Sequence, residues 1–189
     1  MTAGRVVPPL ADPVALLGAA MRYTDAVLSR VAVDDLTGPT PCTDWNLQEL
    51  LAHMHESLVV LDEVALDRAV VLRPAAEPVA TDPVAAVRGR GARMLRSWSR
   101  TDRGVVRVGG AALPSDYAAA AGALEVAVHG WDVSWSLGAP TPVPSALAKE
   151  LLFYAEVFVP DDDREGRFAA PRVSSSPEPG ERLLAFLGR

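Results

Sequence analysis

Glu125 and His129 are the residues of this chain whose types and spacing most clearly suggest chemistry. They stand four positions apart in the stretch SDYAAAAGALEVAVHGWDVSWSL, residues 115–137. On a helix, side chains at this spacing project from the same face. A carboxylate and an imidazole arranged in this way are two of the ligands that a divalent metal takes from proteins. A third ligand must come from another element, and the remaining histidines are His53 and His55.

The helix expected over residues 115–137 differs between its two sides. Small or polar residues share the face of Glu125 and His129, whereas large apolar residues occupy the opposite flank. This pattern predicts that one side packs and that the other has room. The first set is Ala118, Ala121, Gly122, Asp132 and Ser136, and the second is Leu124, Val128, Trp131 and Trp135.

Each candidate residue also has an ordinary interpretation. Glutamate and histidine four residues apart are typical of a surface ion pair, but burying an unpaired carboxylate in so apolar a helix is costly, which favours a metal. Asp132 is the candidate catalytic residue, as an acceptor that orients a ligand or as a proton carrier; a local hydrogen bond explains it equally well.

Cys42 could be a thiolate nucleophile, but no histidine is near it in the sequence, so a small, partly buried side chain is favoured. Trp45 and Trp131 are expected to pack, and an aromatic wall beside a metal would also suit an organic substrate.

Composition excludes several classes of protein. The chain has 189 residues, 49% of them hydrophobic and 22% charged, which is typical of one globular domain, and we expect a single domain over residues 1–189. A net charge of −6 without a basic block disfavours nucleic acid as a partner. One cysteine excludes an internal disulfide and agrees with a reducing cytosol. No signal peptide or membrane-spanning run is found, so we expect a cytoplasmic protein.

Hydrophobic periodicity predicts an all-α fold. We expect a loose arm over residues 1–11, a Pro-rich linker over 73–83, a short extended segment or hairpin arm within 102–114, and an irregular tail over 161–180. Asp44 or Thr43 should cap the second helix, in which His53 and His55 lie on opposite shoulders of the apolar stripe. The expected helices span residues 13–31, 46–67, 83–100, 115–137 and 144–158, followed by a short last helix over 181–188.

Two segments carry a resemblance to a known family. They are TPCTDWNLQELLAHM, residues 40–54, and ALEVAVHGWDVSWSLG, residues 123–138. Together they resemble the N-terminal metal-binding domain of mycothiol-dependent maleylpyruvate isomerase and its DinB-like relatives. The ending ERLLAFLGR is similar to that of a short actinobacterial subgroup of metal-binding proteins. An arginine-rich composition with Lys149 as the only lysine agrees with such a source.

The resemblance implies a DinB-like four-helix bundle with a divalent metal, usually zinc. It implies that His53, rather than His55, joins Glu125 and His129 as the ligands, with one position left for water or a thiol. In such relatives the metal activates a low-molecular-weight thiol such as mycothiol, whose thiolate attacks an electrophile.

The function implied is a zinc-dependent thiol S-transferase or isomerase-like enzyme acting on a small electrophile. A non-catalytic protein that binds a metal and a small ligand is the alternative, and a metal-free bundle is the third. Because the chain ends at Arg189 without the second domain of the isomerase, we do not expect maleylpyruvate itself as the substrate. We expect a small thiol and an electrophile as partners, no nucleic acid or membrane, and a monomer or homodimer.

Overall fold

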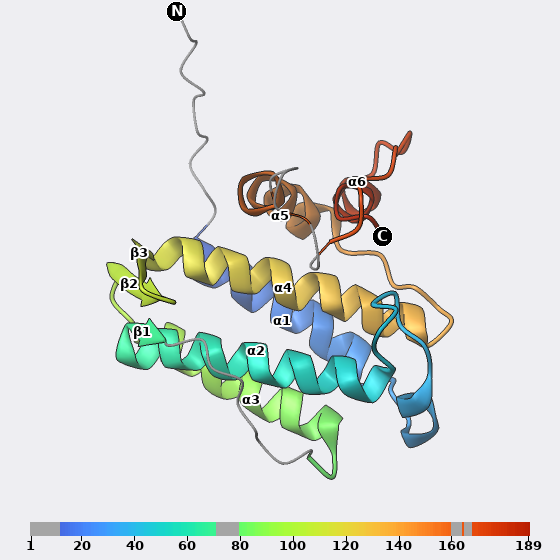
Figure 1. Cartoon of the computed structure of the whole chain (residues 1–189), viewed down its shortest axis with the longest axis horizontal. Helices are drawn as coiled ribbons and strands as arrows, with labels where there is room; N and C mark the ends of the chain where they lie inside the picture. The colour runs from blue at the N-terminus through green and yellow to red at the C-terminus, as the bar shows by residue number, and fades with distance from the viewer. Residues whose placement is uncertain (1–11, 71–79, 160–163, 165–167) are drawn as a thin grey trace, which may run out of the picture.

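The computed structural model describes residues 12–70, 80–159, 164 and 168–189, and it confirms the all-α class (Figure 1). The expected arm at 1–11, most of the linker at 73–83 and part of the tail at 161–180 lie outside the described residues; residues 168–178 form neither helix nor strand, as predicted. The elements are α1 (Pro13–Leu28), the 3-10 helix η1 (Val33–Thr37), α2 (Leu47–Asp67), β1 (Ala69–Val70), α3 (Pro83–Trp98), β2 (Val105–Val108), β3 (Ala111–Pro114), α4 (Ser115–Ser136), α5 (Ser145–Phe158) and α6 (Pro179–Phe186).

Helices α1 to α4 form the predicted four-helix bundle. Helix α4 lies along α1 and also contacts α2, while α2 packs mainly on α3 (Figure 1). Helices α5 and α6 pack on each other, on the side of α4 away from α2 and α3 (Figure 1). No helix within the described ranges combines the length and the apolar character that are needed to cross a lipid bilayer.

The start of α2 is fixed by a reciprocal cap rather than by the predicted Asp44 or Thr43. Asn46 Oδ1 accepts a hydrogen bond from the backbone N–H of Glu49 at 3.0 Å, and Glu49 Oε2 accepts one from the N–H of Asn46 at 2.9 Å. This arrangement satisfies two backbone donors that would otherwise lack partners at the helix end. The cap therefore sets where α2 begins, and with it the position of His53.

Close contact between helices replaces the open side that the sequence predicted for part of α4. A Cβ atom added at Gly122 would lie 2.6 Å from Leu61 Cδ1 of α2, and one added at Gly130 would lie 2.3 Å from Thr24 Oγ1 of α1. The hydroxyl of Thr24 donates to the carbonyl oxygen of Val126 at 2.9 Å. The prediction of free space is thus wrong at Gly122, where a small residue lets another helix approach.

The sequence predicted a short extended segment or a hairpin arm within residues 102–114, and the structure has the hairpin, formed by β2 and β3. Gly109 and Gly110 form its turn with φ of 57° and 89°, a backbone region that side chains with a Cβ rarely adopt. Strand β1 pairs with β2 in parallel and was not predicted, because two residues carry no periodic signal. The small sheet lies at one end of the bundle (Figure 1).

We predict opposite effects on stability for one substitution made at two helical glycines. Gly130→Ala forces a methyl group against the branched side chain of Thr24 and should lower the free energy of unfolding by about 1–3 kcal/mol. Gly89→Ala is the matched control, because a Cβ there meets nothing within 4 Å, and it should raise stability by about 0.5–1 kcal/mol. Urea unfolding measures both, and equal stability of the two variants would contradict the close approach of α1 and α4.

Candidate metal centre

Three side chains from two helices meet at the centre of the candidate site. Glu125 Oε1 lies 2.8 Å from His53 Nε2 of α2 and 3.3 Å from His129 Nε2 of its own helix. One potential ligand atom from each residue lies within 4.8 Å of the other two. The structure therefore brings together the residues that the resemblance implied as ligands. Among the described residues, His55 belongs to no such group.

The second nitrogen of His129 has its own partner. His129 Nδ1 lies 3.0 Å from Asp132 Oδ2, and the Asp132 side chain is completely buried. Arg189 donates to both oxygens of this carboxylate, from Nε to Oδ1 at 2.8 Å and from Nη2 to Oδ2 at 2.9 Å. The guanidinium group thus neutralises Asp132 and leaves it oriented toward the imidazole.

Mutual charge pairing shifts the pKa values of this cluster. Burial would raise the pKa of Glu125, but His129 and then His53 hold it well below its usual range. Burial would lower the pKa of His129, whereas Glu125 and Asp132 raise it well above its usual value. Burial also opposes ionisation of Asp132, yet hydrogen bonds from His129 and Arg189 lower its pKa. Without a metal, the cluster is therefore a network of ion pairs.

Neighbouring residues limit the movement of His53 and Glu125. The Ser57 hydroxyl donates to Glu125 Oε1 at 3.1 Å. The Trp45 ring lies 4.6 Å from the His53 ring between centroids, with 34° between their planes. Thr40 anchors the segment before α2 by donating to the Trp45 carbonyl oxygen at 2.8 Å. Trp45 thus forms an aromatic wall of the site. The sequence had allowed this role beside simple packing in the core.

The cluster lies in a pocket of about 700 Å³. Its apolar walls include Trp45, Leu124, Val128, Phe158 and Phe168. Leu124 and Val128 were predicted on the packed flank of α4, yet they also line this space, because the pocket lies beside α4 between the bundle and the residues that follow α5. A largely apolar pocket with a few polar groups is the usual form of a small-molecule site.

Cys42 lies closer to the site than the sequence suggested. Its Sγ is 3.7 Å from Asp132 Oδ2 and 3.5 Å from Arg189 Nη2, and it lines the pocket. Cys42, His129 and Asp132 form a second set of potential metal ligands. The guanidinium group of Arg189 already binds both carboxylate oxygens of Asp132 and supplies a positive charge there. The set of His53, Glu125 and His129 is therefore the better candidate for a metal site.

Arg189 is the residue of the site that sequence reasoning missed. It lies 57 residues after Asp132, and no periodic pattern links the two positions. A buried aspartate requires a hydrogen-bonding or cationic partner, so the sequence could have predicted one for Asp132. It could not have shown which arginine supplies it. Trp131 packs against the core and does not line the pocket.

Comparison with known proteins gives one family and two relatives. The family model of the mycothiol maleylpyruvate isomerase N-terminal domain matches residues 17–134. Two relatives are Uncharacterized protein MT0763 of Mycobacterium tuberculosis strain CDC 1551 / Oshkosh and Uncharacterized protein Rv0738 of strain ATCC 25618 / H37Rv. Each is 28% identical over 173 residues, which cover 87% of this chain and 90% of the relative. None of the solved structures matches the chain.

The raised pKa of His129 predicts that the metal-free protein loses stability as the pH rises. The stabilisation from protonated His129 is complete below its ordinary pKa of 6.5 and disappears as the pH passes the higher folded-state value. The melting temperature of chelator-treated protein should therefore fall as the pH rises above 6.5.

Thermal unfolding followed by circular dichroism across this range measures the effect. His129→Gln should remove most of the slope, whereas His55→Gln, the matched control, should keep it. A slope that is the same in both variants would show that another group titrates.

Proposed function

Because the chain belongs to the mycothiol maleylpyruvate isomerase N-terminal domain family, we propose that it holds zinc through His53, Glu125 and His129 and uses a thiol such as mycothiol as co-substrate. The family is linked to mycothiol and to metal binding. The reaction proposed is transfer of the thiol to a small electrophile, or an isomerisation that begins with such an attack.

The observation that carries this proposal is the convergence of two imidazole nitrogens and one carboxylate oxygen within 4.8 Å of one another in a pocket. Two histidines and one glutamate are a ligand set found in catalytic zinc sites, which keep a further position for water or substrate. The donor chemistry therefore fits zinc. When bound there, zinc would lower the pKa of a coordinated thiol and so supply a thiolate at neutral pH.

The residues around the ligands have positioning roles in this proposal. Asp132 accepts a hydrogen bond from Nδ1–H of His129, which would leave the Nε2 lone pair of the neutral ring available to a metal beside Glu125. Arg189 binds both Asp132 oxygens, which favours an orienting role for Asp132 over that of a proton carrier. Trp45 restricts the ring of His53. The apolar walls suit an electrophile with a hydrocarbon body and keep water away from the thiolate.

We predict that the three histidines differ sharply in their effect on metal affinity. His53→Ala and His129→Ala should each weaken zinc binding more than about 100-fold, because each removes a direct ligand. His55→Ala, the matched control on the same helix as His53, should change the affinity only a few-fold. Competition with a chromophoric chelator measures affinity, and elemental analysis of untagged protein measures content.

Two results would contradict the assignment. Equal losses for His53→Ala and His55→Ala would show that the ligand set is wrong. A wild-type protein without metal, whose composition is unchanged by His129→Ala, would show that Glu125 and His129 form a structural ion pair.

We also predict that thiols reach the metal. In cobalt-substituted protein, mycothiol should change the visible absorption spectrum and raise the melting temperature, because a thiolate becomes a ligand. The same sugar without its thiol is the control ligand and should do neither. Turnover of mycothiol with chlorodinitrobenzene would support the transferase, whereas a spectral change without turnover of any electrophile would support the non-catalytic alternative. Stoichiometric metal with no response to thiols would contradict the thiol-dependent enzyme.

A further inference from the structure

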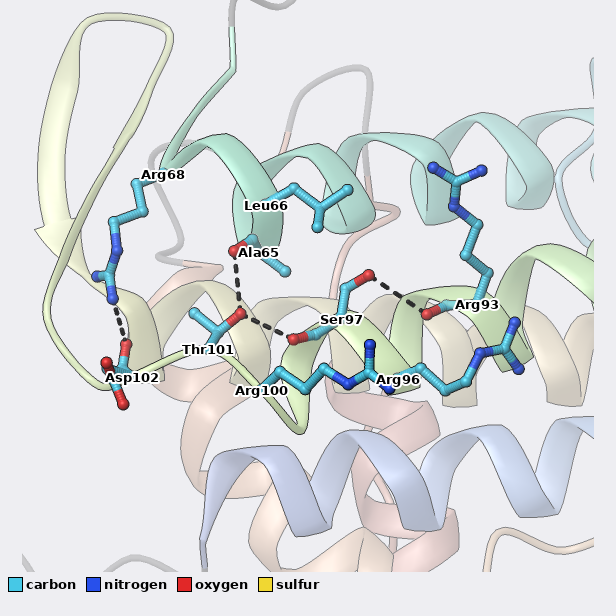
Figure 2. Close-up of a pocket in the computed structure, with 9 residues that line it drawn as sticks. All are labelled: Ala65, Leu66, Arg68, Arg93, Arg96, Ser97, Arg100, Thr101 and Asp102. Atoms are coloured by element: carbon cyan, nitrogen blue, oxygen red, sulfur yellow. Dashed lines mark hydrogen bonds between the residues drawn. The ribbon is translucent and has the colours of Figure 1, made fainter.

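A second concave site lies at the other end of α2 and α3, and it shares no residue with the metal pocket. Its volume is about 490 Å³. Four arginines line it, Arg68, Arg93, Arg96 and Arg100, in a chain whose net charge is −6 (Figure 2). A basic hollow in an acidic protein requires an explanation, because like charges so close together are destabilising.

Some arginines of α3 have carboxylate partners. Arg88 Nε lies 2.6 Å from Asp25 Oδ1, outside the hollow. Asp62 Oδ2 lies 2.8 Å from Arg93 Nε and 3.5 Å from Arg90 Nη1. One buried carboxylate thus faces two guanidinium groups, and the pairing also fixes where Arg93 stands at the rim of the hollow.

Arg96 and Arg100 differ from these residues. They are exposed, they stand one helical turn apart, and both line the hollow (Figure 2). Among the described residues, neither has a carboxylate or other hydrogen-bond partner for its guanidinium group. Arg68, whose positive φ of 54° ends α2, faces the same hollow, where its Nη2 donates to the Asp102 carbonyl oxygen at 2.8 Å. The remaining N–H groups of these three arginines are available to a ligand.

The hydroxyl groups that line the hollow already donate within the protein, so its free donors favour a ligand that accepts hydrogen bonds. The hydroxyl of Ser97 donates to Asp62 Oδ1 at 2.6 Å, and that of Thr101 lies within 2.9 Å of the Ala65 carbonyl oxygen. These hydroxyl protons are therefore already used, and guanidinium groups make up the free donors. Planar guanidinium groups bind phosphate oxygens through paired hydrogen bonds.

We propose that this hollow binds the phosphate group of a small ligand. Several guanidinium groups around one space match a group with two negative charges and three or more acceptor oxygens better than a single carboxylate. The volume exceeds that of one phosphate, and the Leu66 side chain, which is 57% exposed, offers an apolar contact for the rest of the ligand. The Asp102 carboxylate at the rim and the acidic chain as a whole disfavour an extended nucleic acid.

Calorimetric titration of the full-length protein with pyrophosphate, at about 0.15 M salt, tests the proposal. Wild-type protein should show saturable binding with one site. Arg96→Gln and Arg100→Gln should each weaken it at least about fivefold, since each removes charge-assisted hydrogen bonds. Arg182→Gln is the matched control, because it removes the same charge from an exposed position on α6, and it should leave affinity unchanged. Circular dichroism spectra verify that each variant is folded.

Further titrations identify the source of the phosphate. Tighter binding of glycerol phosphate than of inorganic phosphate would support a phosphorylated metabolite, and the reverse order would support the free ion; either agrees with the proposal. Absence of saturable binding to all three phosphates would overturn it. So would equal affinity in the double variant Arg96→Gln/Arg100→Gln, or binding seen only with a single-stranded oligonucleotide.

Discussion

The imidazole of His129 is held on both sides, and the candidate metal centre depends on this. Its Nε2 faces Glu125 and its Nδ1 faces Asp132, so one ring connects two acidic groups. Burial opposes the ionisation of both carboxylates, most strongly that of the completely buried Asp132, and cationic partners offset this effect. Glu125 has two histidines, and Asp132 has His129 and Arg189. The polar network is complete only when α2, α4 and the end of the described chain are all in place.

Helix packing brings these groups within reach of one another. Glycines at 122 and 130 let α2 and α1 approach α4 more closely than larger residues would allow. The approach of α2 matters most, because it places His53 beside Glu125 across two separate helices. The same packing leaves the other side of Glu125 and His129 facing the pocket. The glycines of α4 thus determine how closely the neighbouring helices approach, and this distance allows Glu125 to contact His53.

Much of this organisation could be predicted from the sequence, for identifiable reasons. The helices follow from apolar periodicity, the hairpin from its glycine pair, and the proximity of Glu125 to His129 from their spacing. The choice of His53 over His55 came from the family resemblance, because the apolar periodicity of α2 does not show which of its two shoulders faces the site. Leu124 and Val128 show why the pocket could not be outlined: an apolar side chain looks the same in sequence whether it meets the core or a ligand. Arg189 and β1 depend on tertiary contacts, which leave no periodic pattern.

The distance along the chain between Asp132 and Arg189 affects how fragments of this protein should be chosen. The family match ends at residue 134, only just beyond Asp132, whereas the guanidinium group that neutralises this aspartate comes 57 residues after it. A fragment cut at the limit of the match would keep the three candidate ligands but would leave Asp132 without the guanidinium group that binds both of its oxygens. Loss of metal binding in such a fragment would then reflect a missing counter-ion, and would be no guide to the competence of the ligands themselves.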